Sequence, residues 1–223
     1  MRNVMRAIFI GVALALACAA AHAQPATTQP AHSDSERDAR CREAASKYIH
    51  PSPNKEHLTV EAEDAYEYQQ EKMYLRLCGD SDDALTRRVK ESVESHEAAQ
   101  TLARLLPAAR KAGSPESKDP NTYAAIAAAY EFQLVLLYRW NKTVANTAGG
   151  AKEFTVAIDR QTDLLIDAYA RAVAACGTRA DCQPQKDAWM QKLTGLYRSR
   201  HGGSDAGLEE FIRGALDRPF PNP

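Results

Sequence analysis

The fold of this 223-residue chain is decided by residues 121–144, NTYAAIAAAYEFQLVLLYRWNKTV. Wound at 100° per residue, the segment places Ile126, Tyr130, Leu134 and Leu137 on one stripe and further apolar side chains on most other sides. A helix that is apolar nearly all round is buried among other helices. We therefore expect a buried central helix beginning at Pro120, whose narrow polar face holds Glu131 and Arg139.

Six further segments with helical spacing flank this one, and none has a strand pattern of useful length. The expected helices span about residues 34–49, 60–78, 81–113, 152–175, 185–200 and 205–216. The expected N-caps of the first three helices are Ser33, in a capping box with Glu36, then Thr59, and then Asp80 or Ser81. The glycines expected to end helices are Gly79, Gly113 and Gly177. Pro107 predicts a kink or break in the third helix. The fold class is all-α: a single disulfide-stapled bundle, or stacked hairpins, of about seven helices.

The first 23 residues, MRNVMRAIFIGVALALACAAAHA, have the pattern of a secretory signal. Two arginines precede an uncharged run, and Ala21-His22-Ala23 matches the small-x-small cleavage pattern. We expect cleavage after Ala23 and a bacterial protein that is periplasmic or secreted. The alternative is a lipoprotein anchored through Cys18, because residues 15–18 loosely resemble a lipobox.

The remaining chain divides into three parts by composition. Residues 24–33 are polar and proline-bearing and are expected to form a disordered leader, residues 34–216 form the helical domain, and residues 217–223 form a proline-rich tail. Removing residues 1–23 takes away two of 28 basic residues and none of 29 acidic ones, which leaves a net charge of −3. A mildly acidic chain without a basic cluster lacks the charge pattern of nucleic-acid binders.

Four cysteines follow the signal: Cys41, Cys78, Cys176 and Cys182. In an oxidising compartment an even set of this kind predicts two disulfides. Cys176 falls on the inner stripe of its helix, Gly177 ends that helix, and Pro184 suits the first turn of the next. We therefore expect a Cys176–Cys182 disulfide at a helix-helix turn and, by elimination, a Cys41–Cys78 disulfide.

Metal and redox chemistry at the Cys176 pair are disfavoured by spacing and position. The C-x5-C spacing is not the C-x2-C pair of a zinc site, and no other ligand pair flanks it. A helix C-terminus also opposes a thiolate, whereas reactive C-x-x-C cysteines lie at a helix N-terminus. We expect a structural disulfide and no cofactor or metal.

Three groups of ionisable side chains invite a functional interpretation. His50, His57 and Glu61 are the nearest approach to a metal cluster, but their spacing matches no known site, which favours loop and cap roles. His96 lies on the apolar stripe of the third helix and is expected to be a hydrogen-bonded core or boundary residue. Glu131 could be a general acid if buried alone, but a salt bridge is the favoured interpretation.

The second helix carries an acidic stripe of Asp64, Glu67 and Glu71, opposite an apolar face that includes Met73 and Leu77. A basic partner is one explanation, but pairing with Arg37 of the first helix, or simple solvation, is favoured.

Four aromatic side chains are the most open question. They are Tyr68, Tyr74, Trp140 and Trp189, which either complete the core or anchor an interface, and the core is favoured.

No catalytic or nucleotide-binding motif is present in the sequence. The leading hypothesis is therefore a non-enzymatic protein of the bacterial cell envelope that acts through protein-protein contact, as an adaptor, a scaffold or an immunity-type inhibitor. The alternative is a small-molecule binder in which the third to fifth helices enclose an apolar pocket. A hydrolase built on Glu131 or His96 is the third possibility.

Overall fold

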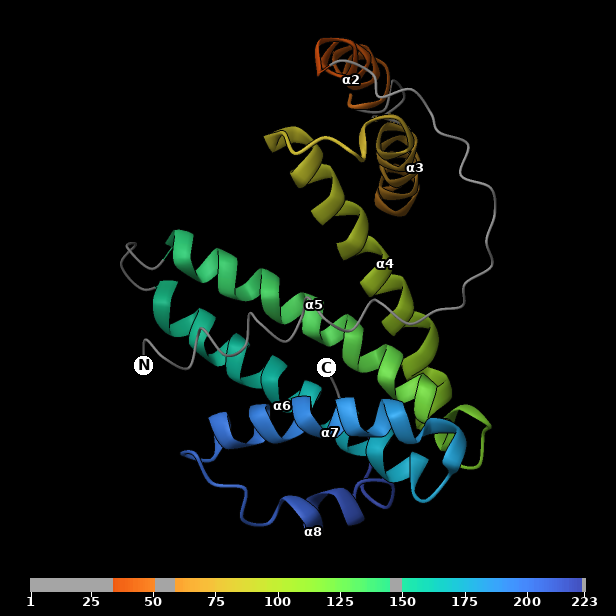
Figure 1. Ribbon diagram of the computed structural model, residues 1–223, viewed down its shortest axis with the longest axis vertical. Coiled ribbons are helices and arrows are strands. Elements are labelled where there is room, and N and C mark those ends of the chain that lie inside the picture. The colour runs from red at the N-terminus through yellow and green to blue at the C-terminus, as the bar shows by residue number, and fades with distance from the viewer. Residues whose placement is uncertain (1–33, 51–58, 145–149, 222–223) are drawn as a thin grey trace. The chain divides into compact units, whose positions relative to one another are not determined.

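A computed structural model describes residues 34–50, 59–144 and 150–221 of the chain (Figure 1). The predicted signal, leader and Ser33 cap lie outside these residues. The chain divides into a first unit, Met1–Arg37, and a second unit, Asp38–Pro223. The described part of the first unit is the first turn of a helix, in which Arg37 pairs with Asp34 at 2.9 Å.

Seven α-helices pack against one another, and the described residues contain no strand. They are α2 (Asp34–Tyr48), α3 (Val60–Cys78), α4 (Ala84–Arg110), α5 (Pro120–Val144), α6 (Gly150–Cys176), α7 (Gln183–Arg200) and α8 (Leu208–Arg213), with the 3-10 turns η2 (Glu116–Lys118) and η3 (Ala180–Cys182). The predicted all-α class and number of helices are confirmed. None of the described helices combines the length and the apolar character that a membrane span requires.

The main core is built around α5 and α6, which run antiparallel, with α7 returning along α6 (Figure 1). Ile126 and Ala127 of α5 are completely buried, as the predicted central helix requires. Val135 and Tyr138, in the second half of α5, are 41% and 47% exposed, however. The expectation of burial on all sides is wrong for this half of α5, because the neighbouring helices do not cover Val135 and Tyr138 fully.

A second core joins α3 to α2 and to the first half of α4. Its buried side chains are Cys41, Ala44, Tyr68, Tyr74, Cys78, Val89 and Val93. The hydroxyls of Tyr74 and Thr86 lie 2.8 Å apart and link α3 to α4 in the interior. The predicted apolar face of α3 is not the buried one, since Met73 and Leu77 are exposed. Tyrosine and cysteine side chains fill this core instead.

Most predicted helix ends are confirmed. Thr59 Oγ1 accepts a hydrogen bond from Ala62 N at 3.3 Å at the start of α3, and Gly79 follows its last residue. Gly177 has a φ of +54° and follows the last residue of α6, a conformation that favours glycine. Pro184 lies in the first turn of α7.

The predicted limits of α4 are wrong at both ends. Its N-cap is Asp83, not Asp80 or Ser81, and it ends at Arg110 rather than Gly113. It also continues through Pro107 without a break. Pro107 lies in the last turn, where a missing N–H removes one helical hydrogen bond with only three residues still to come.

Candidate functional site

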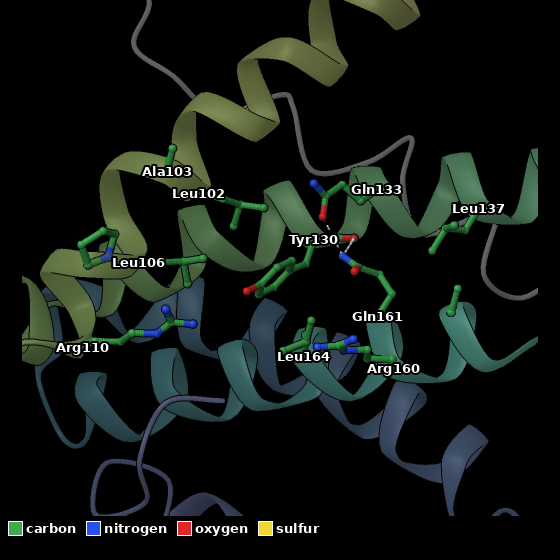
Figure 2. A pocket seen from close by; sticks show the side chains of 12 residues that line it. Leu102, Ala103, Leu106, Arg110, Tyr130, Gln133, Leu137, Arg160, Gln161 and Leu164 are labelled. Carbon is green, nitrogen blue, oxygen red and sulfur yellow. Dashed lines mark hydrogen bonds between the residues drawn. The ribbon is translucent and has the colours of Figure 1, made fainter. Parts of the chain in front are cut away.

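A pocket of ≈ 510 Å³ opens between α4, α5 and α6 (Figure 2). The side chains that line it are Leu102, Ala103, Leu106, Pro107, Arg110, Tyr130, Gln133, Leu137, Ala157, Arg160, Gln161 and Leu164. More than half of them are apolar. The volume lies within the 300–1,000 Å³ typical of small-molecule sites. These are also the three helices between which the small-molecule hypothesis placed a pocket.

Tyr130 contributes a buried hydroxyl without a hydrogen-bond partner to this pocket. The residue is 1% exposed, and among the described residues its hydroxyl has no donor or acceptor within reach. An unpaired buried polar group costs about 1–3 kcal/mol. Burial raises the pKa of Tyr130, and the charge of Arg110 opposes that shift. The hydroxyl is therefore protonated at neutral pH and available as a donor.

The other polar groups of the pocket are neutral amides and cations. Gln161 Nε2 donates to the Tyr130 carbonyl oxygen at 3.1 Å and to Gln133 Oε1 at 3.0 Å, which ties α6 to α5 (Figure 2). Arg110 and Arg160 bring guanidinium groups from α4 and α6, and both residues are exposed. No aspartate or glutamate is among the lining residues, so the pocket has only positive formal charge.

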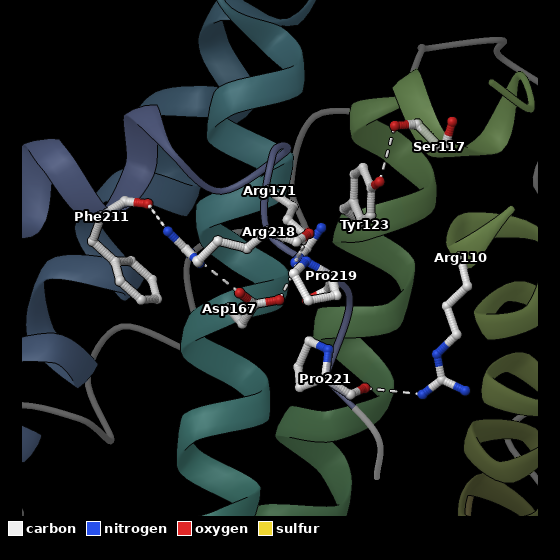
Figure 3. Close-up of polar contacts among 9 residues, drawn as sticks. All are labelled: Arg110, Ser117, Tyr123, Asp167, Arg171, Phe211, Arg218, Pro219 and Pro221. Carbon is white, nitrogen blue, oxygen red and sulfur yellow. Dashed lines mark hydrogen bonds and ion pairs between the residues drawn. The ribbon is translucent and has the colours of Figure 1, made fainter. Parts of the chain in front are cut away.

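Arg110 is held from outside the pocket by residues near the C-terminus. Its Nη2 donates to the Pro221 carbonyl oxygen at 2.9 Å (Figure 3). Its guanidinium lies 5.8 Å from the centre of the Phe220 ring. No sequence pattern predicted this contact. Tyr130 is predicted as a core residue, but nothing in the local sequence shows that its hydroxyl is unpaired.

A second groove, of ≈ 530 Å³, lies between α3, α4 and α5. Its lining includes the predicted acidic stripe of Asp64, Glu67 and Glu71, together with Glu91, Arg88 and Trp140. Burial raises the pKa of Glu71, and a hydrogen bond with Ser92 opposes this. Arg37, whose pairing with the stripe is one of the two favoured explanations, forms an ion pair with Asp34 one turn away.

The histidines are not brought together in the described residues. His50 follows α2, Glu61 lies in the first turn of α3, and His57 falls outside the described residues. In the described part of the chain, no three His, Cys, Asp or Glu side chains are grouped closely enough to hold a metal ion. His96 stacks on Tyr68 with ring centres 4.2 Å apart, and its Nε2 lies 2.8 Å from Gln100 Nε2. The predicted hydrogen-bonded boundary role of His96 is confirmed.

Glu131 forms the predicted salt bridge. Lys192 Nζ lies 2.7 Å from its Oε2, and the Tyr169 hydroxyl donates to the same oxygen at 2.9 Å. Burial, reinforced by Glu131, raises the pKa of Tyr169, so this hydroxyl remains a donor. On the same predicted polar face, Arg139 pairs with Glu91 at 2.7 Å.

Three of the four questioned aromatic side chains belong to the cores. Tyr68 and Tyr74 are buried, and Trp189 packs against the main core. Trp140 differs, with half of its surface exposed at the edge of the acidic groove.

The four cysteines form two pairs at disulfide distance, with the predicted partners. Cys41 and Cys78 have a Cα–Cα distance of 5.5 Å, and Cys176 and Cys182 have one of 6.1 Å. Both distances lie in the range that a disulfide requires. Paired cysteines of this kind are typical of oxidising compartments outside the cytoplasm.

No protein-family model, no curated protein and no solved structure matches this chain.

Proposed function

We propose that the protein binds a small, largely apolar molecule in the pocket between α4, α5 and α6. The observation that carries this proposal is the Tyr130 hydroxyl, which is buried at an apolar pocket and has no hydrogen-bond partner among the described residues. A ligand with a polar atom regains the hydrogen bond that the ligand-free protein forgoes. Because the hydroxyl is closed off from solvent, the ligand reaches it after one of the lining side chains rotates.

A binding role also agrees with the state of the candidate catalytic groups. Glu131 is engaged by Lys192 and Tyr169, so its carboxylate is held in an ion pair. His96 is covered on one ring face by Tyr68. We therefore propose a non-enzymatic binder of the periplasm, where the cysteine pairs are oxidised.

The Tyr130→Phe variant tests the proposal, because it removes only the hydroxyl. Since that hydroxyl is unpaired, the ligand-free variant is expected to be as stable as the wild type or more stable by about 1 kcal/mol in urea unfolding. Affinity for decanol and decanoate, measured by isothermal titration calorimetry, is expected to fall about tenfold, the value of one hydrogen bond.

Tyr123→Phe is the matched control. Tyr123 is also buried in α5, but its hydroxyl donates to the Ser117 carbonyl oxygen at 2.9 Å. Loss of this hydrogen bond in Tyr123→Phe is expected to lower the free energy of unfolding by about 1 kcal/mol and to leave ligand affinity unchanged. A Tyr130→Phe variant that is destabilised as much as Tyr123→Phe, with unchanged affinity, would refute the pocket.

A second candidate function is the binding of a basic partner protein at the groove between α3, α4 and α5, which carries Asp64, Glu67 and Glu71. This function corresponds to the adaptor or inhibitor hypothesis. Trp140 supports it, since tryptophan is a common interface anchor and this one is half exposed beside Glu67 and Glu71. A partner captured from the native envelope by the wild type is expected to be lost with Trp140→Ala. Equal recovery by both proteins would exclude this groove.

A further inference from the structure

The charged side chains of the pocket indicate which polar group its ligand carries, which the apolar side chains cannot do. Two of the five polar side chains that line it are arginines, Arg110 and Arg160, and no lining residue is acidic. The two glutamines hydrogen-bond to each other, and Gln161 also bonds to the backbone of Tyr130. Other donors of the lining are the Tyr130 hydroxyl, the amide nitrogen of Gln133 and the Arg110 guanidinium.

Arg110 is the better placed of the two arginines. At the end of α4, its Nη2 donates a hydrogen bond to the Pro221 carbonyl oxygen (Figure 3). The Phe220 ring makes a cation-π contact with the same guanidinium. The hydrogen bond to Pro221 uses Nη2 and leaves the Nε and Nη1 donors of the guanidinium to face a ligand. Figure 2 shows the Tyr130 hydroxyl directed from α5 toward the Arg110 side of the pocket. A neutral donor and a cation thus converge from two helices.

We infer that the ligand is an apolar chain ending in a carboxylate, which the Tyr130 hydroxyl and the Arg110 guanidinium bind while the chain lies along the leucines of α4, α5 and α6. This inference rests on the proposed function. A carboxylate has two acceptor oxygens and one negative charge, which match one hydroxyl donor and one guanidinium. The leucines available to the chain are Leu102, Leu106, Leu137 and Leu164.

The test compares three ligands of the same chain length below their micelle concentrations: decanoate, decanol and decylammonium. By titration calorimetry at pH 7, decanoate is expected to bind at least about tenfold more tightly than decanol, since a charge-assisted hydrogen bond exceeds a neutral one. Decylammonium is expected to bind most weakly, because the arginines repel it.

The Arg110→Gln variant tests whether Arg110 is the residue that binds the negative charge of the ligand. It is expected to lower decanoate affinity about tenfold and to leave decanol affinity unchanged. The control is Arg104→Gln, which removes an exposed arginine of α4 that does not line the pocket. It is expected to change neither affinity.

The outcomes separate this inference from the proposed function. If decanol binds as tightly as decanoate and Tyr130→Phe weakens both, the carboxylate inference fails and the pocket remains a binding site. If decylammonium binds most tightly, the charge assignment is wrong. If none of the three ligands binds the wild type, both proposals fail.

Discussion

At the scale of single residues, Asp83 caps α4 with four hydrogen bonds to its carboxylate. One of its oxygens accepts from the backbone N–H groups of Leu85 and Thr86, at 2.8 and 2.9 Å. The other accepts from the hydroxyls of Thr86 and Ser81, at 2.7 and 2.6 Å. Thr86 in turn meets the Tyr74 hydroxyl in the interior. The cap of α4 is therefore continuous with the second core.

Replacing Asp83 by alanine is expected to lower the free energy of unfolding by about 2 kcal/mol at pH 7, the upper range for an N-cap, because four hydrogen bonds are lost. These hydrogen bonds hold the pKa of Asp83 well below its ordinary value. A lowered folded-state pKa gives stability that is present above the unfolded-state pKa, near 4, and is lost as the pH falls toward the folded value.

The difference between wild type and Asp83→Ala is accordingly expected to be constant from pH 7 to about pH 4 and to shrink below it. Urea unfolding at several pH values measures it. Asp82→Ala, at the neighbouring exposed aspartate, is the control and should change stability by less than about 0.5 kcal/mol. A difference that grew on acidification would contradict the assignment.

Some residue-scale features had a sequence signal and others had none. The Asp-x-x-Thr spacing of Asp83 and Thr86 recurs in Asp119 and Thr122, where Asp119 caps α5 with bonds of 3.0 and 3.1 Å. That spacing is readable from the sequence and would have corrected the predicted start of α4. The unpaired hydroxyl of Tyr130 is not readable, because it depends on what α4 and α6 place opposite it.

At the scale of helices, local signals predicted the ends better than the faces. Gly177 and Pro184 act within one turn, so the α6–α7 junction follows from the sequence. The burial of α5 does not, because its apolar composition shows only that it can be buried on all sides. Which side chains remain exposed, such as Tyr138, depends on how the other helices pack around α5.

The two cysteine pairs act on different lengths of chain. Cys176 and Cys182 are six residues apart and close the α6–α7 turn, whereas Cys41 and Cys78 are 37 residues apart and connect α2 to the end of α3. In the chain-entropy model, disulfides at these separations stabilise by about 2.4 and 3.9 kcal/mol. The longer one matters more for α2, which otherwise contributes few buried side chains.

At the scale of the second unit, residues 217–221 connect helices that are distant in the sequence (Figure 3). Arg171 of α6 is 3% exposed, pairs with Asp167 at 2.5 Å, and donates from Nη2 to the carbonyl oxygens of Arg218 and Pro219, both at 3.1 Å. Arg218 donates back to Asp167 at 3.3 Å and to the Phe211 carbonyl oxygen at 2.8 Å. This segment thus satisfies a buried ion pair of the main core.

The aromatic ring of the same segment completes this arrangement. Phe220 lies 4.6 Å from the Arg171 guanidinium and stacks with Tyr123 of α5 at 6.0 Å between ring centres. Proline-rich composition predicted only that the segment does not continue a helix. Its contacts depend on Arg171, whose need for acceptors appears only once α6 is buried.

Ending the chain after Asp217 is therefore expected to lower the free energy of unfolding by about 3 kcal/mol, because Arg171 loses two acceptors and Asp167 loses one of its two cationic partners. Urea unfolding measures the loss, and hydrogen exchange is expected to increase most in α6 around residue 171. The matched control ends after Pro221 and keeps the Arg218 and Pro219 carbonyl oxygens that Arg171 uses, so its stability should stay close to that of the full chain. If the truncation after Asp217 left stability and exchange unchanged, residues 218–221 would lie on the core without supporting it.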